Sequence, residues 1–247
     1  MAISTNSIIH YTKSFEILSS ILREGFKIKY CAEVLKLGKV GSSQAAHPMI
    51  SFCDIPLSNS SQHFDAYGNY GLGLTKEWAV KNGVNPVLYI DKDSLIAESI
   101  YSLIKERRKS DTNLTAKQKR EILQVKSYAK NYKGTLKRNG KPDKKNYVFY
   151  NEREWRLIPP KDKINNKLFS INLKNYHNDK DKYNNDLDDC RYTFDIQDIS
   201  YIIVEKTNEI PEMVKILREL HYDKVSGNKL DILLSKICST EQILSDY

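Results

Sequence analysis

Cysteine is scarce and scattered in this sequence. The four cysteines, Cys31, Cys53, Cys190 and Cys238, lie far apart, and no two of them form a C-x-x-C pair. A zinc knuckle or a disulfide framework is built from closely spaced cysteines, so neither kind of site is indicated and we expect no metal ion. The sequence therefore predicts four free thiols, most of them buried.

Long apolar runs are also missing. No run approaches the roughly 20 residues that a membrane helix needs, and the first six residues, Met-Ala-Ile-Ser-Thr-Asn, lack the basic and apolar regions of a signal peptide. The composition nevertheless includes 40% hydrophobic and 10% aromatic residues in a chain of 247. We therefore expect a globular cytoplasmic protein with a packed core and no membrane contact.

Two familiar ligand loops are absent. Gly68, Gly71 and Gly73 cluster together, but no Gly-Lys-Ser/Thr follows them and no strand-then-helix pattern surrounds them, so a phosphate loop is not indicated. The acidic stretch at 178–189 lacks the central glycine and the terminal glutamate of a calcium-binding EF-hand loop. The acidic stretch is better interpreted as a solvated loop.

Positive charge is concentrated in one segment. The whole chain carries a net charge of +8, yet residues 101–146 alone hold fifteen Lys and Arg against four Asp and Glu, a net charge of +11. The rest of the chain is therefore slightly acidic, at −3. A basic block of this kind is typical either of a solvated helix face or of a contact with a polyanion such as nucleic acid.

Hydrophobic periodicity predicts short strands mixed with helices. Apolar residues at helical spacing follow Ser14, a good N-cap, and stop at Gly25. Residues 38–47 and 133–146 look like loops, because small, polar and basic residues dominate them. Strands are expected at 7–12, 48–56, 86–90, 168–173 and 199–204, and helices at 58–67, 210–220 and, in two pieces separated near 111–115, 94–132. Without regular strand-helix alternation, this mixture favours the α+β class.

Two carboxylates stand out in the apolar, aromatic-rich run 147–158. Glu152 and Glu154 are two residues apart, and in a strand that spacing places both on one face. A carboxylate near an apolar wall needs a partner or a chemical role, because burying an isolated charge costs several kcal/mol. Arg153 and Arg156 are candidate ion-pair partners. The run is therefore either a catalytic strand or an ion-pair ladder.

The order of these motifs resembles that of the ADP-ribosyltransferase fold. More closely, the segments His10-Tyr-Thr, 48–58, 67–78, 85–89 and Asn151-Glu-Arg-Glu-Trp-Arg156 look like the AbiGi family of bacterial abortive phage-infection proteins. The resemblance covers most of residues 8–160. That family has been labelled the antitoxin-like partner of a second gene product, whereas the fold resemblance implies a transferase.

The resemblance implies an ADP-ribosyltransferase-like split β-sheet core in a single domain, 1–247, with a helical basic insertion at 94–146. Its substrate would be NAD, and the implied catalytic residues are Glu154, which would stabilise the cationic ribose, and its helper Glu152. The NAD-contacting residues implied in the same way are His10, Thr12, Ser51, Tyr67 and Tyr70. These residues are then expected to converge on one cleft.

Two functions stay open at this point. The first is an NAD-dependent ADP-ribosyltransferase-type effector or toxin of anti-phage abortive infection. The alternative is a non-enzymatic antitoxin-like or nucleic-acid-binding regulator, acting with a partner protein encoded alongside. Nucleic acid would then contact the basic insertion through Arg107, Arg108, Lys109, Lys137 and Arg138. A metal-dependent nuclease is less favoured, because no carboxylate cluster with metal-ligand spacing is evident.

Overall fold

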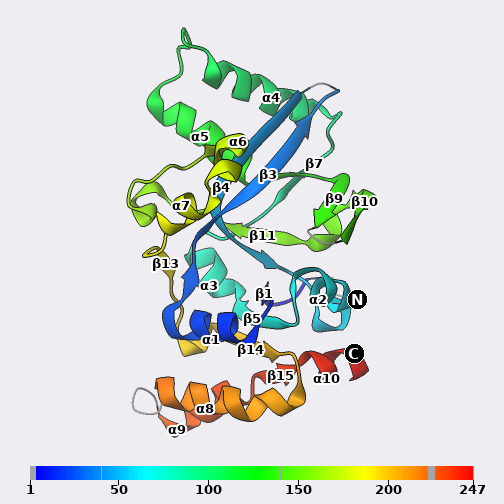
Figure 1. The fold of residues 1–247 in the computed structure, drawn as a ribbon, viewed down its shortest axis with the longest axis vertical. Coiled ribbons are helices and arrows are strands. Elements are labelled where there is room, and N and C mark those ends of the chain that lie inside the picture. Colours follow the sequence, from blue (N-terminus) through cyan, green and yellow to red (C-terminus); the bar gives the residue numbers. More distant parts are fainter. Residues whose placement is uncertain (1–3, 40, 139–140, 222–225, 247) are drawn as a thin grey trace. The chain divides into compact units, whose positions relative to one another are not determined.

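The computed structural model describes residues 4–39, 41–138, 141–221 and 226–246, without the side chains of Lys137, Arg138 and Lys141. Within these ranges the chain forms two compact units. Unit 1 comprises residues 1–27, 51–84 and 191–247, and unit 2 comprises 28–50 and 85–190. Both units combine helices with strands, which confirms the predicted α+β class (Figure 1). The predicted single domain, 1–247, stays a prediction.

Unit 1 contains a sheet built around β1 (Ser7–Thr12). This strand pairs antiparallel with β5 (Tyr70–Thr75) along its whole length, and Ile9 also pairs with Cys53 at the end of β4 (Gly41–Cys53). Next to β5 lies β14 (Ile199–Val204), antiparallel, followed by β15 (Ile237–Ser239), parallel to β14. The predicted strands at 7–12 and 199–204 are thus confirmed.

Capped amphipathic helices bury the faces of this sheet. In α1 (Phe15–Glu24) the Ser14 side chain accepts a hydrogen bond from the Ile17 N–H, and the helix ends at Gly25 as predicted. The unit also contains α2 (Ser61–Tyr67), α3 (Lys76–Lys81), α8 (Ile210–His221), α9 (Gly227–Leu234) and α10 (Thr240–Asp246), together with the strand pair β2 (Phe26–Lys27) and β13 (Arg191–Tyr192). Apolar faces of α1 and α8 supply much of the buried surface.

The glycine cluster has a packing role. A Cβ on Gly73 would lie 3.0–3.1 Å from the Tyr201 side chain on the neighbouring strand, so only glycine allows β14 to lie this close. Gly68 ends α2 with a φ of 122° and passes against the backbone of Thr12, where a Cβ would lie 2.2 Å from the carbonyl oxygen. These contacts agree with the interpretation that the cluster is not a phosphate loop.

Unit 2 is organised on a long hairpin. Strand β3 (Lys29–Leu37) pairs antiparallel with β4 from Lys29↔Met49 to Leu37↔Gly41, and β12 (Ile171–Asn172) adds to β4 at Ala45 and Ala46. The prediction of a loop at 38–47 was therefore wrong for the part from Gly41 onward. Its small and polar residues have weak strand propensity, but pairing with both β3 and β12 satisfies their backbone groups.

The predicted insertion, 94–146, lies wholly within unit 2. It begins with α4 (Leu95–Arg108) and α5 (Ala116–Ser127), separated as predicted. The loop predicted at 133–146 was wrong, because these residues form β9 (Lys133–Arg138) and β10 (Lys141–Val148), which pair as an antiparallel hairpin. Between them and α5 runs β8 (Ala129–Asn131), parallel to β7 (Leu88–Ile90). The remaining elements are β6 (Asn85–Pro86), β11 (Glu154–Leu157), α6 (Leu173–Asn178) and α7 (Lys180–Asn185).

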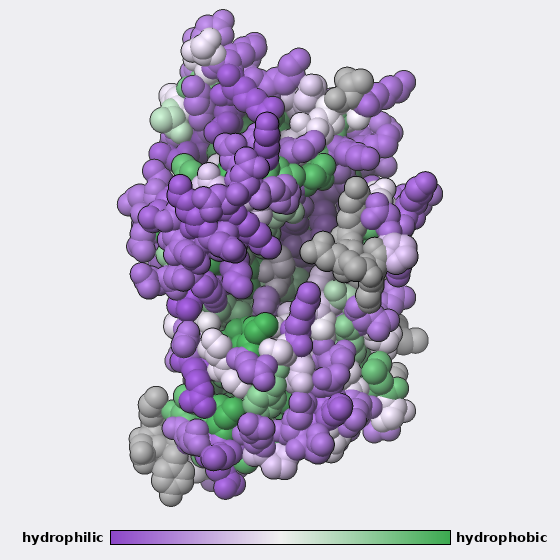
Figure 2. Space-filling view, viewed as in Figure 1, coloured by the Kyte–Doolittle hydropathy of each residue, from purple (hydrophilic) through white to green (hydrophobic). Residues whose placement is uncertain are grey.

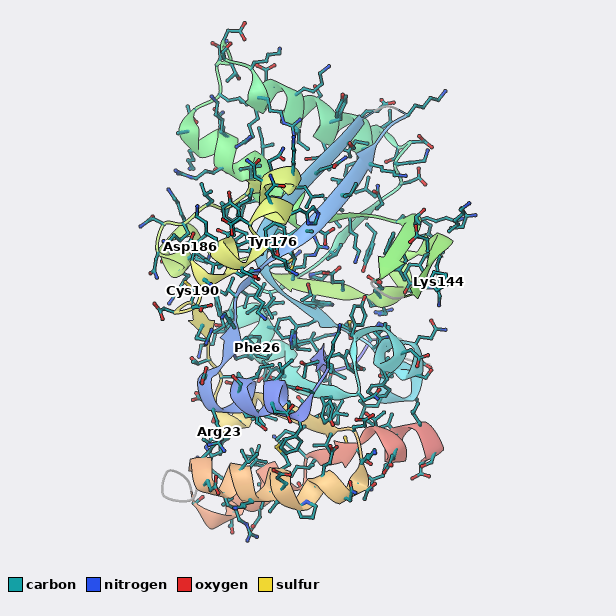
Figure 3. The ribbon with its side chains drawn as sticks, viewed as in Figure 1. Arg23, Phe26, Lys144, Tyr176, Asp186 and Cys190 are labelled. Carbon is teal, nitrogen blue, oxygen red and sulfur yellow. The ribbon has the colours of Figure 1, made fainter. Side chains whose placement is uncertain are left out.

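Buried polar side chains connect these pieces of unit 2. The Asn131 amide accepts from the Lys36 N–H and donates to the Lys36 carbonyl, both at 2.8 Å, so one side chain replaces a strand neighbour for β3. The hydroxyl of Tyr176, labelled in Figure 3, donates to the Tyr30 carbonyl at 2.7 Å. An apolar core joins α4 to the β3 strand through residues such as Leu35 and Ile104.

Candidate functional site

The chain turns sharply between the two candidate carboxylates. Residues Phe149–Glu152 form a short 3₁₀ turn, Arg153 adopts a left-handed conformation with φ of 45°, and only from Glu154 does the chain continue as β11. The prediction that Glu152 and Glu154 share one continuous strand was therefore wrong. Aromatic strand-formers at 147–150 gave no signal for this turn, because the left-handed residue is an arginine rather than glycine.

Both carboxylates nevertheless meet at one cation. Lys130 Nζ lies 2.6 Å from Glu152 Oε2 and 2.9 Å from Glu154 Oε2, and it also stands over the Phe149 ring at 5.1 Å. Glu152 is 2% exposed and Glu154 is 7% exposed. The two acids are therefore buried together and bridged by a lysine that β8 supplies.

Arg156 holds Glu154 from the other side. Its Nε donates to Glu154 Oε1 at 2.8 Å and its Nη2 to Glu154 Oε2 at 3.1 Å, the bidentate geometry that arginine makes with carboxylates. The same guanidinium donates to Glu33 Oε1 and to the Ser127 carbonyl, each at 2.8 Å. Arg156 is fully buried. The ion pair that the sequence left open as the alternative to a catalytic strand is therefore present.

We call Glu33, Lys130, Glu152, Glu154 and Arg156 the buried ion cluster. Burial by itself would raise the pKa of Glu154, but Arg156 and Lys130 outweigh it and hold the pKa far below its usual range. Burial would likewise lower the pKa of Lys130, yet Glu154 and Glu152 raise it well above normal. The charges of Glu154 and Lys130 therefore persist at neutral pH, and neither side chain is suited to exchange protons with a substrate.

The backbone next to the cluster is held as firmly. The Glu154 N–H donates to the Tyr89 hydroxyl at 2.9 Å, and the Val87 N–H donates to the Glu154 carbonyl at 2.9 Å. Lys130, Glu33 and Tyr89 were not singled out from the sequence. They lie 24, 121 and 65 residues from Glu154, with no motif to mark them, so only the fold brings them together.

The NAD-contacting residues implied by the resemblance lie in unit 1, whereas Glu152 and Glu154 lie in unit 2. The His10 ring sits between Phe26 and Phe52, with centroids at 5.3 and 5.8 Å, and its Nδ1 donates to the Ser51 carbonyl at 2.8 Å (Figure 3 labels Phe26). His10 and Ser51 are thus brought together. Their convergence with the two glutamates on one cleft stays a prediction.

The tyrosines and Thr12 in unit 1 have structural contacts. The Tyr70 hydroxyl donates to Glu209 at 2.8 Å and to Glu205 at 3.2 Å, and burial, together with these carboxylates, raises the pKa of Tyr70. Thr12 is buried opposite Tyr70 in the β1–β5 pairing. Tyr67 packs its half-buried ring near His63 at 5.8 Å. None of these contacts tests a role in binding NAD.

Three of the proposed nucleic-acid contacts lie at the C-terminal end of α4. Arg108 and Lys109 are exposed, whereas Arg107 is half-buried and its Nε donates to the Lys119 carbonyl at 3.0 Å. Lys109 forms an exposed ion pair with Glu106 at 2.6 Å. The side chains of Lys137 and Arg138 lie outside the described residues. Over unit 2, the face shown in Figure 2 is mostly hydrophilic, with single hydrophobic residues between the polar ones.

Three general findings bear on function. None of the four cysteines forms a disulfide bond, and only Cys53 and Cys190 are fully buried. In the ranges that the structure describes, we find no grouping of three or more His, Cys, Asp or Glu side chains placed to hold a metal ion. Among the same residues, no helix combines the length and the apolar character needed to cross a membrane.

Comparisons with known proteins identify relatives of the chain. Residues 23–205 match the model of a family described as "Putative abortive phage resistance protein AbiGi, antitoxin". The chain is also 25% identical over 221 residues to the abortive phage resistance protein AbiGi of Lactococcus lactis subsp. cremoris, covering 81% of this chain and 88% of that protein. No solved structure matches, so the ADP-ribosyltransferase-like core has no structural support. Because the family model spans about three quarters of the chain, the protein belongs to the AbiGi family of abortive phage resistance proteins.

Proposed function

We propose that this protein is a non-catalytic, antitoxin-type component of an abortive phage infection system and that it acts by binding a partner protein. The observation that carries the proposal is the state of Glu154. Both of its carboxylate oxygens are engaged, by Lys130 and by Arg156, at 2.8 to 3.1 Å. A carboxylate that stabilises a cationic ribose must direct its charge at the substrate, and this charge is already neutralised inside unit 2.

The family supports the same function. Its description includes the word antitoxin, and the relative from Lactococcus lactis is named for abortive phage resistance. An antitoxin-type protein needs a binding surface more than it needs a reactive group. The surface must expose apolar side chains that a partner can cover, because removing apolar area from water supplies most of the driving force for association.

A groove between α4 and α5 offers that surface. It has a volume of about 260 Å³, and its walls are almost entirely apolar. Leu103 and Val125, one from each helix, are 47% and 50% exposed although they face this groove. The remaining lining residues are Ile100, Leu114, Gln118, Glu121 and Ile122. We call this feature the α4–α5 groove.

The groove fits a helix of the partner. Its α5 wall presents Gln118, Ile122 and Val125 at helical spacing, so that a third helix can lay its own apolar stripe between the two walls. The surrounding segment, 101–146, has a net charge of +11. The complementary partner helix therefore carries acidic residues on either side of its apolar stripe, which speeds the encounter and fixes the orientation.

The test is co-expression with the toxin-type protein encoded alongside, followed by a binding measurement on the purified pair. Leu103→Glu with Val125→Glu should abolish both binding and protection from growth arrest, since two charges would be buried in an apolar interface. Leu95→Glu is the matched control, because Leu95 is on α4 and 81% exposed but does not line the groove. This control should bind like the wild type.

The enzyme alternative has a direct assay. In this assay the purified protein is incubated with NAD, the predicted substrate, and the release of nicotinamide is measured. The enzyme alternative requires that nicotinamide is released and that Glu154→Gln abolishes the release while the protein stays folded. That result would overturn the non-catalytic proposal. Glu152→Gln is the companion variant, because Glu152 accepts from Lys130, whereas Arg156 donates to Glu154, Glu33 and the Ser127 carbonyl.

A further inference from the structure

A second cavity in unit 2 is lined by positive charge. It has a volume of about 320 Å³ and is lined by Arg120 and Gln124 from α5, by Lys161 and by Phe169. Arg120 and Gln124 are four residues apart on the helix, so both project from the same face. Lys161 begins a short 3₁₀ turn after Pro160. We call this cavity the α5 pocket; its volume is at the small end of the range for ligand sites, roughly 300–1,000 Å³.

The cations of the α5 pocket lack carboxylate partners. In the part of the chain that the structure describes, neither Arg120 nor Lys161 lies within 4.0 Å of an Asp or Glu oxygen. Other cations of the same segment are paired, as Lys117 is with Glu121. Two cations without carboxylate partners that line one cavity suit an anion, because a bound anion would supply the missing counter-charge.

A buried cation lies on the same helix as Arg120 and Gln124. Lys126, also on α5, is only 6% exposed, and burial, reinforced by Arg108 and Arg107, lowers its pKa to about 8. Beneath Phe169 lies His47, 1% exposed, whose Nδ1 donates to the Phe169 carbonyl at 3.1 Å. Burial and then Lys126 lower the pKa of His47 to about 3, so His47 stays neutral and adds no further charge.

We propose that the α5 pocket binds a mononucleotide, with its phosphate between Arg120 and Lys161 and its base against Phe169. Arginine and lysine are the side chains that bind phosphate best, and the Gln124 amide adds a neutral donor. Phe169 is half-buried and offers an aromatic surface for a base to stack on. This site is separate from the α4–α5 groove, so the inference does not rest on the proposed function.

Calorimetric titration of the purified full chain tests the proposal. AMP and ATP should bind, and inorganic phosphate should bind at least tenfold more weakly because it lacks the stacking base. The variant Arg120→Ala with Lys161→Ala should weaken AMP binding roughly 10- to 100-fold, the loss expected for charged hydrogen bonds. The matched control, Lys117→Ala with Lys163→Ala, removes two exposed lysines from the same two elements and should leave AMP affinity unchanged.

Proton uptake gives a second readout. A bound phosphate raises the pKa of Lys126 from about 8, so binding at pH 8 should take up a fraction of a proton, seen as a buffer-dependent binding heat. The charged and titratable groups acting on Lys126 are Arg107 and Arg108 from α4, Glu33 from β3 and His47 from β4. Lys126→Met should remove the uptake.

Several results would overturn the inference. One is the absence of nucleotide binding at millimolar concentration, and another is equal weakening by the pocket variant and its matched control. Equal affinity for AMP and inorganic phosphate would contradict the proposed stacking of the base on Phe169. A short oligonucleotide that binds far more tightly than AMP, with steep salt dependence, would make nucleic acid the ligand instead.

Discussion

Unit 2 contains two charged regions that follow opposite rules. In the buried ion cluster both cations, Lys130 and Arg156, donate to at least two carboxylate or carbonyl oxygens, at distances between 2.6 and 3.1 Å. In the α5 pocket, Arg120 and Lys161 have no carboxylate within 4.0 Å among the described residues. The charges of the first region are paired with each other, whereas the cations of the second region can pair with a ligand.

This difference indicates which charged groups can bind a ligand at low energetic cost. A paired and desolvated charge costs several kcal/mol to expose or to leave alone, so the cluster is fixed in one arrangement. An unpaired cation at a cavity costs little to engage, because an incoming anion replaces water rather than a protein partner. The acidic motif at Glu152 and Glu154 is thus paired inside the protein, whereas Arg120 and Lys161 have no carboxylate partner among the described residues.

Removing Arg156 should produce the largest effect. Arg156→Met leaves the buried Glu154 and the half-buried Glu33 without their guanidinium, and breaking a buried pair in this way should lower the free energy of unfolding by about 3–5 kcal/mol. Urea denaturation followed by circular dichroism measures the loss. Arg120→Met is the contrasting variant and should change stability by less than about 0.5 kcal/mol, because Arg120 is exposed. Equal losses in the two variants would contradict the comparison.

Glu154→Gln should cost less and should depend on pH. The variant keeps the Arg156–Glu33 and Lys130–Glu152 pairs, so we expect a loss of about 1.5–3 kcal/mol at pH 7, typical of hydrogen bonds to charged groups. The folded pKa of Glu154 lies below its ordinary value of 4.5, so its contribution is present above that pH and disappears as the pH falls through the folded pKa.

The stability difference between Glu154→Gln and the wild type should therefore be widest above about pH 5 and narrow in acid. Denaturant titrations at pH 7, 5 and 3 measure it. Lys174→Gln, an exposed change on α6, serves as a control for altered net charge. A difference that stays constant from pH 7 to 3 would mean that Glu154 is not held ionised by its partners.

Removing Lys126 should increase the free energy of unfolding rather than lower it. Its folded pKa of about 8 lies below the ordinary 10.5, so the unfolded chain binds more protons between these values and the wild type gains stability as pH rises from 8 to 10.5. At pH 7 the buried charge is a cost, and Lys126→Met should stabilise the protein by about 1–3 kcal/mol. Thermal unfolding at pH 7 and pH 10 checks both signs. Destabilisation at pH 7 would place Lys126 among the paired charges.

Local signals in the sequence predicted some elements well. The Ser14 cap, the apolar spacing of α1 and the stop at Gly25 are all short-range features, and each is present in the structure. β14 was equally clear because five of its six residues are apolar or aromatic. The Gly41–His47 part of β4 and the β9–β10 hairpin were missed, because their polar and basic residues are held in strands by partners distant in the sequence or by a hairpin turn.

The sequence predicted several residues of the candidate site but not whether their charges are paired. The sequence singled out Glu152, Glu154 and Arg156, since charges beside aromatic residues are conspicuous, and it offered two roles for them. Which role applies depends on Lys130 and Glu33, and no spacing rule connects these residues to Glu154. The α5 pocket was missed for the same reason, because Lys161 and Phe169 lie 41 and 49 residues beyond Arg120.

The sequence by itself determined the α+β class, the separation of α4 from α5, the concentration of positive charge in 101–146 and the family. These depend on composition, on neighbouring residues and on motif order, all of which are local. Only the tertiary structure decided that Glu154 is neutralised and that the cations around Arg120 are not. Whether a charge is paired depends on which distant side chains share its burial, and the energy that fixes the pairing is gained only when the chain has folded.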